Sequence, residues 1–308
     1  MKKVLVTGAA GFIGRHSLPF LSSLGYEIHA VTSRQNATPE GEAHWHVTDL
    51  LDPHQVDALF AEVQPTHLLH LAWYTAHGKY WTSPENLKWA QAGIQLFRSF
   101  VQNGGRRVVS AGTCAEYDWR YGYCSEGVTP LAPATLYGTC KHALEHILAS
   151  ASLAHNVSMA WGRVFFLFGP HEPPGRLVPS VIRSLLAGDP ALSSHGGQIR
   201  DFLHVRDVAE AFVSLLESEV TGPVNIASGK PVTLREVIHK IADRLCRPDL
   251  VRLGSLPARP DDPDLLLADV RRLTREVGWM PRHTLDEGLE ETIAWWREVG
   301  NGHIGAET

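Results

Sequence analysis

Two residues of this 308-residue chain could carry out proton chemistry together. Tyr137 and Lys141 lie four residues apart in "TLYGTCK", a spacing that would place both side chains on one face of a helix. A lysine ammonium near a phenol favours the phenolate, so we expect the pKa of Tyr137 to fall toward neutrality. A tyrosine tuned in this way can exchange a proton with a substrate hydroxyl or carbonyl. Thr113, in "VVSAGTCAEYD", adds a hydroxyl group at the end of an expected strand.

A dinucleotide-binding loop is predicted near the N-terminus. In "VLVTGAAGFIGRH", Gly8, Gly11 and Gly14 fall directly between an apolar run and an amphipathic stretch. Glycines at this spacing permit a tight turn, and they let backbone N–H groups approach a pyrophosphate at the positive end of the next helix. The order of strand, glycine loop and helix predicts a Rossmann cofactor site, with Phe12 and Ile13 also expected to contact the cofactor.

The end of the second expected strand indicates which dinucleotide fits. An acidic residue there would bond the ribose hydroxyls, whereas small polar and basic residues accept a 2′-phosphate. The segment "AVTSR" carries no acid, so Ser33 and Arg34 favour NADP(H) over NAD(H). The alternative is that Arg34 simply points into solvent. Further cofactor contacts are expected after the third and fourth strands, at Asp49, Leu50, Leu71 and Ala72.

Short β-branched runs alternate with longer amphipathic stretches along the chain. This alternation predicts an α/β fold with a Rossmann-type doubly wound parallel sheet. We expect residues 1–169 to form the dinucleotide-binding domain and residues 170–308 mainly a smaller α/β substrate domain, with residues 201–227 returning to the first. Helical spacing of apolar residues predicts helices over 84–103 and 136–153. These helices could pair across a homodimer, or they could simply pack on the sheet.

Charge and hydropathy exclude several classes of partner. The formal net charge is −5, and no long basic run is present, so neither nucleic acid nor an anionic membrane surface is an expected partner. No apolar run reaches the roughly 20 residues needed to span a bilayer. We read "MKKVLV" as a first strand and not as a signal peptide, because no cleavage site follows it. A cytoplasmic protein with a small-molecule partner is expected.

Cysteine and histidine positions do not indicate a metal site. The four cysteines are too irregularly spaced for a disulfide framework or a zinc site, and they suggest a reducing compartment. His44 with His46, and His67 with His70, lack the spacing of ligand pairs on a helix. No bound metal is therefore expected.

Together these motifs resemble the short-chain dehydrogenase/reductase superfamily, and specifically its extended, nucleotide-sugar-modifying branch. The likeness covers nearly the whole chain, since "TGAAGFIG", "HLAW", "SAGT", "YGTCK", "GRVFFLFGP" and "RDFLHVRDVAEAF" fall in the family's order. The resemblance implies a catalytic triad in which Thr113 bonds the reacting sugar oxygen and Tyr137 acts as acid or base. Lys141 would also hold the nicotinamide ribose. Hydride would pass between nicotinamide and a sugar carbon.

The two residues that directly follow Thr113 distinguish the activities within this branch. The 4,6-dehydratases carry an Asp-Glu pair there to remove water, whereas this chain has Cys114 and Ala115, which are poor substitutes. The epimerising cysteine of the GDP-fucose synthases would fall at Ala115, so Cys114 is interpreted as a small buried residue. What remains is hydride transfer with a single proton donor. With an NADP-type second strand, this favours one-way reduction of a nucleotide-linked 4-keto-6-deoxyhexose.

The C-terminal half supplies the expected nucleotide-sugar contacts. In relatives, an arginine at the place of Arg200 reaches the phosphates or the ribose of the nucleotide, and one at the place of Arg259 reaches the diphosphate, whose charge two guanidinium groups suit. The alternative for each arginine is a surface salt bridge, and Arg259 lies among several aspartates. Phe166 replaces an asparagine that touches the sugar in many relatives. Tyr74 and His77 follow a strand end, where such pockets lie. If the enzyme epimerised, His77 or His171 would be the base to test first.

Three other functions stay open at this point. A nucleotide-sugar 4-epimerase with tightly bound NAD(P) needs the same minimal set of side chains. A redox-inactive NADP-binding regulator would have no need for an activated phenol. A reductase of a non-sugar carbonyl would not require the paired arginines.

Overall fold

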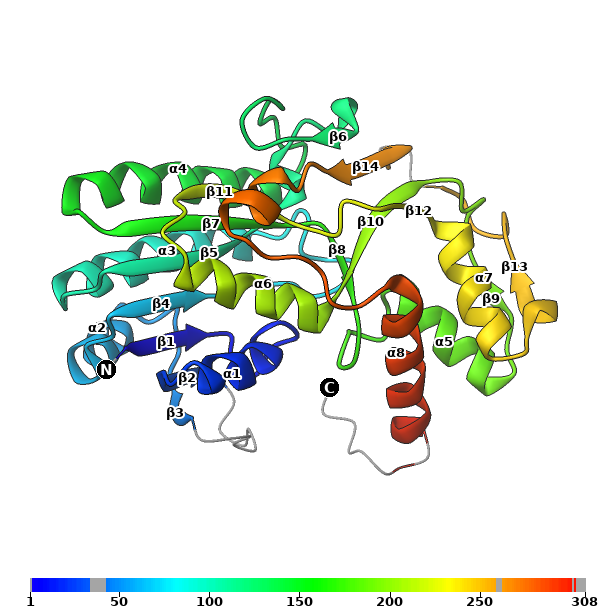
Figure 1. The fold of residues 1–308 in the computed structure, drawn as a ribbon, viewed down its shortest axis with the longest axis horizontal. Helices are drawn as coiled ribbons and strands as arrows, with labels where there is room; N and C mark the ends of the chain where they lie inside the picture. The colour runs from blue at the N-terminus through cyan, green and yellow to red at the C-terminus, as the bar shows by residue number, and fades with distance from the viewer. Residues whose placement is uncertain (1, 34–42, 259–261, 301, 303–308) are drawn as a thin grey trace.

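A seven-stranded parallel sheet forms the centre of the larger part of the molecule (Figure 1). The computed structural model describes residues 2–33, 43–258, 262–300 and 302. The strand order is β11-β7-β5-β4-β1-β2-β3, and every neighbouring pair is parallel. The strands are β1 (Lys3–Thr7), β2 (Glu27–Thr32), β3 (His44–Val47), β4 (His67–His70), β5 (Arg107–Thr113), β7 (Ser158–Val164) and β11 (Gly222–Ile226). The predicted doubly wound parallel sheet is confirmed.

Helices cover both faces of this sheet, as all-parallel sheets require. Helices α1 (Gly14–Ser23) and α6 (Val205–Glu217) pack together on one face. Helices α2 (Pro53–Val63), α3 (Glu85–Gln102) and α4 (Leu136–His155) pack in sequence on the other. Strand β5 is buried along its whole length between the two layers.

The helices predicted over 84–103 and 136–153 correspond to α3 and α4. Their apolar residues do not all face the sheet. Phe97 is buried, but Leu87 and Ile94 on α3 and Ile147 on α4 are exposed. The helical spacing therefore predicted both helices correctly, and it left open which of their apolar residues pack on the sheet.

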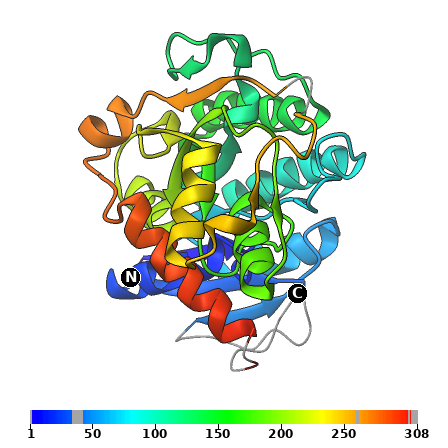
Figure 2. The ribbon, with the colours of Figure 1, turned by 90° about the vertical axis from the view of Figure 1, so that its right-hand side faces the viewer.

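A second, smaller sheet lies beside the first. Its order is β12-β10-β14-β6, with β8 paired to β10, and a separate pair joins β9 to β13. These strands are β6 (Tyr123–Cys124), β8 (Phe166–Phe168), β9 (Ala191–Leu192), β10 (Ile199–His204), β12 (Pro231–Thr233), β13 (Val251–Arg252) and β14 (Leu265–Ala268). Helices α5 (Leu177–Ala187), α7 (Leu234–Arg244) and α8 (Leu285–Gly300) pack on one another around a third core, and they face the viewer in Figure 2.

The chain crosses between the two sheets more than once. After β10 in the small sheet, α6 and β11 return to the large one, as expected for part of residues 201–227. In the other direction, β6 leaves the N-terminal half to pair with β14. The division into domains at residue 169 stays a prediction. The described residues also include the short helical turns η1 (Cys114–Glu116), η2 (Trp119–Tyr121), η3 (Pro248–Leu250) and η4 (Arg272–Glu276).

None of the helices in the described part of the chain combines the length and the apolar character needed to cross a membrane.

Candidate active site

The glycine loop after β1 forms a close-packed backbone cradle. Gly8 has a φ of +69°, which favours glycine, and a Cβ added to it would lie 2.9 Å from the backbone nitrogen of Ala72. A Cβ on Gly14 would lie 2.1 Å from the carbonyl oxygen of Gly8, so α1 can begin here only with glycine. The backbone N–H of Gly11 donates to Gly8 at 2.9 Å. This cradle at the start of α1 fits the phosphates of a dinucleotide.

The same carboxyl edge of the sheet gathers most other residues expected to contact the cofactor. Leu71 and Ala72 follow β4 beside Gly8, and the N–H of Ala72 donates to the hydroxyl of Thr7 at 3.3 Å. Phe12 and Ile13 are half-buried in the loop itself. Leu50 is buried after β3, whereas Asp49 is exposed and accepts from the backbone N–H of Leu51 at 2.9 Å. Ser33 is exposed at the end of β2, and Arg34 lies outside the described residues.

Thr113 and Tyr137 come together at the end of β5. The hydroxyl of Thr113 caps η1 by accepting from the N–H of Ala115 at 3.2 Å, and it lies close enough to the Tyr137 phenol to lower the pKa of that phenol. Helix α4 begins just before Tyr137 because Thr135 accepts from the N–H of Gly138 at 3.1 Å. A Cβ on Gly138 would lie 2.3 Å from the carbonyl oxygen of Ala115. This glycine therefore lets the first turn of α4 approach Thr113.

Lys141 lies one turn further along α4 and is buried against β5. Its ammonium group donates to the carbonyl oxygen of Ala111 at 2.7 Å. The Lys141 nitrogen lies 3.8 Å from the centre of the Trp73 ring, within the range of a cation–π contact. Burial lowers the pKa of Lys141 to about 7, and the carboxylate of Glu116 acts in the opposite direction. Lys141 can thus exist in either charge state near neutral pH.

The expected fall in the pKa of Tyr137 is wrong for this structure. Burial, and then the Tyr80 phenol, raise the pKa of Tyr137 above its ordinary value, and the Thr113 hydroxyl opposes the rise only in part. Burial dominates because Tyr137 is only 9% exposed. The Lys141 ammonium is directed at a backbone carbonyl and its own charge is weakened by burial. Tyr137 therefore keeps its proton at neutral pH.

Aromatic rings surround Tyr137. The ring centroids of Tyr80, Trp81 and Trp73 lie 4.9, 5.8 and 6.4 Å from that of Tyr137. Trp119 contacts Trp81 at 6.1 Å, and its indole N–H donates to the carbonyl oxygen of Cys114 at 2.8 Å. We call Trp73, Tyr80, Trp81 and Trp119 the aromatic wall. It leaves little polar surface on this side of the phenol.

A buried ion network beneath Thr113 was not predicted from the sequence. Glu116 accepts from the backbone N–H of Thr113 at 2.8 Å and from Arg163 at 2.6 Å. Arg163 also pairs with Glu145 at 2.8 Å, and Trp161 donates to Glu116 at 3.0 Å. The signal in the sequence was a glutamate three residues after a hydroxyl residue, which is the spacing of a capping box. The network fixes the backbone that carries Thr113.

Cys114 and Ala115 are both buried beside Thr113. Burial, then the neighbouring Cys124, raise the pKa of the Cys114 thiol above its ordinary value. A protonated thiol packed among apolar side chains is not a general base. The structure therefore agrees with the interpretation of Cys114 as a small buried residue.

The residues expected to bind the nucleotide sugar are brought together only in part. Arg200 and Phe166 meet because β8 and β10 are neighbours, and the guanidinium lies 5.4 Å from the centre of the Phe166 ring. Arg200 is buried and pairs with Asp262 at 2.6 Å. Tyr74 is half-buried and His77 exposed in the loop after β4, where a Cβ on Gly175 would meet the His77 ring at 2.9 Å. Arg259 lies outside the described residues.

His171, the other candidate base, contacts Trp295 and Arg15. Its ring lies 4.6 Å from Trp295, and Nδ1 contacts the guanidinium of Arg15. Burial, and then the charges of Arg15 and His16, lower the pKa of His171 to about 4.

Known proteins with this architecture bind nucleotide sugars. The solved structure of MoeE5 in complex with UDP-glucose and NAD is 34% identical to this chain, with a TM-score of 0.85 and coverage of 96% of this chain and 99% of that one. The UDP-glucose 4-epimerase of Bacillus subtilis (strain 168) is 28% identical over 99% of both chains. UDP-glucuronic acid decarboxylase 1 of Danio rerio is 28% identical over 96% of this chain and 72% of that protein.

These relatives give no support to the NADP(H) preference expected from Ser33 and Arg34, since the dinucleotide in the MoeE5 complex is NAD. They do confirm the resemblance to extended short-chain dehydrogenases/reductases. The profile of the NAD dependent epimerase/dehydratase family matches residues 4–227. This chain belongs to that family of nicotinamide-dependent, nucleotide-sugar-modifying enzymes.

Proposed function

We propose that this chain reduces the keto group at C4 of a nucleotide-linked 4-keto-6-deoxyhexose. The observation that carries the proposal is the pair of Thr113 and Tyr137, together with the buried thiol and methyl group at the two positions that follow Thr113. Reduction needs one proton and one hydride, and it needs no second acid–base pair. A dehydration would need such a pair, and Cys114 and Ala115 do not supply one.

Each residue of the triad has a distinct task in this reaction. A bound nicotinamide dinucleotide, held at the glycine cradle, supplies the hydride. Tyr137 donates its phenolic proton to the carbonyl oxygen, which becomes the product hydroxyl. Thr113 orients that oxygen through its hydroxyl. Lys141, whose pKa is about 7, contributes positive charge near the phenol when the proton leaves.

The surroundings of Tyr137 support reduction over epimerisation. An epimerase must present both faces of the keto carbon to one nicotinamide, so the sugar has to turn over in its pocket. We expect the aromatic wall, which packs against Tyr137, to hinder such a turn. Its apolar surface also suits the C6 methyl of a 6-deoxy sugar.

A nucleotide-sugar 4-epimerase is the second candidate. Support for it comes from the relatives, since the Bacillus subtilis protein carries the name UDP-glucose 4-epimerase. A 4-epimerase would use the same hydroxyl, phenol and nicotinamide, and it would regenerate the cofactor within one turnover.

The stoichiometry of the cofactor separates these functions. Purified protein is mixed with NADH or NADPH and a nucleotide-linked 4-keto-6-deoxyhexose, and absorbance of the reduced nicotinamide is followed beside product formation. We expect one reduced cofactor to be consumed per product. Interconversion of UDP-glucose and UDP-galactose without net consumption would establish the epimerase instead. Cofactor binding without turnover of any keto sugar nucleotide would favour the redox-inactive regulator.

We expect NADH to serve at least as well as NADPH. The NAD in the MoeE5 complex supports this choice, and it outweighs the pattern at Ser33 and Arg34. Dissociation constants for both reduced forms, measured on wild type and on Arg34→Ala, test the choice. A selective loss of NADPH affinity in the variant, with NADPH bound more tightly by wild type, would restore the NADP(H) assignment.

We propose that Arg200 binds the diphosphate of the substrate and that Arg259 joins it, with Tyr74, His77 and Phe166 near the sugar. Asp262 supports the first assignment because it and the carbonyl oxygen of Ile199 hold the buried Arg200 guanidinium in one orientation. Arg200→Ala should raise KM for the nucleotide sugar by roughly 10- to 100-fold with little change in kcat. Unchanged KM would favour a non-sugar carbonyl substrate.

We also propose a homodimer formed through α3 and α4. The exposed apolar side chains of Leu87, Ile94 and Ile147 on these helices support it. Light scattering should give twice the chain mass, and Ile94→Glu should give the monomer mass.

A further inference from the structure

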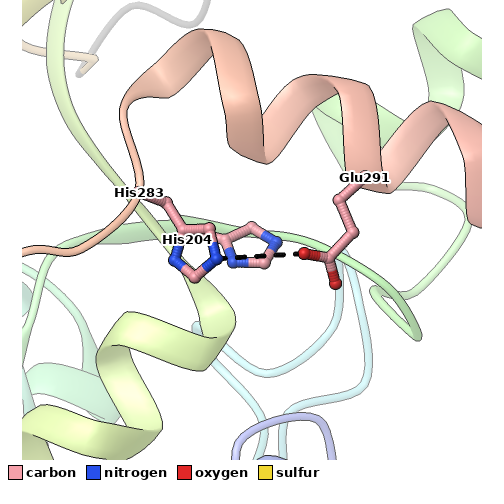
Figure 3. A group of neighbouring side chains, drawn as sticks. All are labelled: His204, His283 and Glu291. Atoms are coloured by element: carbon pink, nitrogen blue, oxygen red, sulfur yellow. Dashed lines mark ion pairs between the residues drawn. The ribbon is translucent and has the colours of Figure 1, made fainter.

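Three side chains outside the candidate active site meet at one point (Figure 3). His204 ends β10, His283 precedes α8, and Glu291 lies on α8. One possible ligand atom from each residue lies within 4.8 Å of those from the other two. We call these residues the His-His-Glu cluster. Imidazole and carboxylate groups are the ligands of zinc and related divalent ions.

His204 is the least satisfied member of the cluster. It is 2% exposed, and neither of its ring nitrogens has a hydrogen-bond partner among the residues that the structure describes. Its ring contacts Phe168 at 5.5 Å and His283 at 4.7 Å between centroids. Buried polar atoms without partners are rare in folded proteins because their lost hydration is not replaced. A metal ion that accepts the lone pair of a His204 ring nitrogen would offset this lost hydration.

His283 is oriented as a metal-binding histidine would be. Its Nδ1 lies 2.7 Å from Oδ1 of Asp207, and the other Asp207 oxygen accepts from the backbone N–H groups of Arg282 and His283 at 3.1 and 2.9 Å. Asp207 thereby fixes the proton on Nδ1 and leaves Nε2 as the free position. Carboxylates commonly hold metal-bound histidines in this way.

The free nitrogen of His283 faces the carboxylate of Glu291. Nε2 lies 3.9 Å from Oε2, which is too long for a hydrogen bond, and Figure 3 marks this pair with a dashed line. A lone pair and a carboxylate oxygen repel each other unless a cation lies between them. That cation is either a proton on His283 or a metal ion shared with His204.

We propose that the His-His-Glu cluster binds one divalent transition-metal ion of the zinc class, with Asp207 supporting His283. Two ligand atoms on a tetrahedral zinc ion lie about 3.4 Å apart, so small side-chain rotations close the site. His283 and Glu291 are each 27% exposed, which gives the ion and a fourth ligand from water a path inward. Arg206 lies 3.2 Å from Glu291 and opposes binding, but its side chain is 51% exposed and can turn into solvent.

The site would act as a clamp between distant parts of the chain. His204 lies where β10 leads into α6 of the large layer, while His283 and Glu291 belong to the C-terminal helix region. An ion bound to all three would tie α8 to the start of α6. An ion that binds only the folded protein raises its melting temperature.

Metal titration of the full-length protein tests the proposal. The protein is treated with a chelator, dialysed, and titrated with Zn²⁺ by calorimetry and with Co²⁺ by visible absorption, while Tm is followed in parallel. We expect one ion per chain, the d–d bands of a nitrogen- and oxygen-ligated Co²⁺, and a higher Tm with metal. Asp207→Asn should weaken binding by roughly 10- to 100-fold.

Three substitutions identify the ligands. His283→Gln and Glu291→Gln are at partly exposed positions, so these variants should fold, and each should abolish the Co²⁺ bands and the metal-dependent rise in Tm. His239→Gln, at an exposed histidine on α7, is the matched control and should bind as wild type does. Absence of saturable binding would overturn the proposal. Binding of the metal by His283→Gln and Glu291→Gln with the affinity of wild type would also overturn it. The ion would then be held by other histidines among the 17 of this chain.

Discussion

The ammonium nitrogen of Lys141 lies 3.8 Å from the centre of the Trp73 indole ring, although one residue belongs to α4 and the other to the loop after β4. The indole face and the carbonyl oxygen of Ala111 together replace only part of the water that the buried ammonium has lost. The pKa of Lys141 is therefore lowered to about 7. Burial of the Lys141 ammonium therefore costs the folded protein stability.

Lys141→Met should separate stability from activity. Methionine fills the space without a charge, so the protein without cofactor should gain roughly 1–3 kcal/mol in free energy of unfolding. Turnover should fall by about 100-fold or more, because the phenol loses its electrostatic support. Chemical denaturation and steady-state kinetics measure the two effects. A loss of both stability and activity would assign Lys141 a structural role.

Tyr137→Phe should abolish most of the turnover and leave the dinucleotide in place. The ring that packs among Tyr80, Trp81 and Trp73 remains, and only the proton donor is removed. General acid catalysis contributes roughly 10²- to 10⁴-fold, so kcat should fall by that factor. The dissociation constant for NADH should stay within about threefold of wild type. A comparable loss of cofactor affinity would mean that Tyr137 mainly supports the fold.

Glu116→Gln should destabilise the protein by about 3 kcal/mol, because it removes one partner of the buried Arg163 guanidinium. The matched control is Glu85→Gln, which breaks the exposed pair with Lys88 at 2.7 Å and should cost less than about 1 kcal/mol. Because Glu116 also accepts from the N–H of Thr113, kcat should fall as well. Urea denaturation measures the free energy of unfolding of both variants. Equally small losses in Glu116→Gln and Glu85→Gln would show that the buried ion network is not needed for stability.

His70 should make the fold sensitive to acid. Burial, and then the charge of Lys141, lower the pKa of His70 from 6.5 to about 3. Between these values the unfolded chain binds one proton more than the folded chain, so stability falls as pH falls from about 6.5 toward 3. His70→Asn keeps a polar group near the Thr7 hydroxyl and removes the titration. It should flatten the pH dependence by up to about 1.4 kcal/mol per pH unit in this window. If the free energy of unfolding of His70→Asn changed with pH as steeply as that of wild type, this would contradict the buried, neutral state of His70.

Local patterns in the sequence were sufficient for the central sheet, whereas the pairing of Thr113 with Tyr137 was implied by the family resemblance. Gly8 and Gly14 reveal their role through spacing alone, because a backbone cradle tolerates no side chain at these positions. Tyr137 and Lys141 share a helix, and their proximity follows from its period. The direction of the Tyr137 pKa did not follow, since burial depends on rings contributed by segments far apart in the chain.

Long-range partners could not be predicted from the sequence. His204 and His283 are separated by 79 residues (283 − 204), and no local spacing relates them. Arg200 was assigned to a diphosphate, and only the structure gives its pairing with Asp262. Leu87 and Ile94 fit a helical stripe but lie on an exposed face, because periodicity does not say which of two apolar faces meets the sheet.

The fate of the hydride tests the central claim most directly. The protein is given NADH with deuterium at both positions of nicotinamide C4 and a nucleotide-linked 4-keto-6-deoxyhexose, and the product is analysed by mass spectrometry and NMR. Reduction with Tyr137 as proton donor predicts deuterium at C4 of the sugar in a single configuration, with one labelled cofactor consumed per product. A product without deuterium at C4, or label in both C4 configurations, would contradict the account.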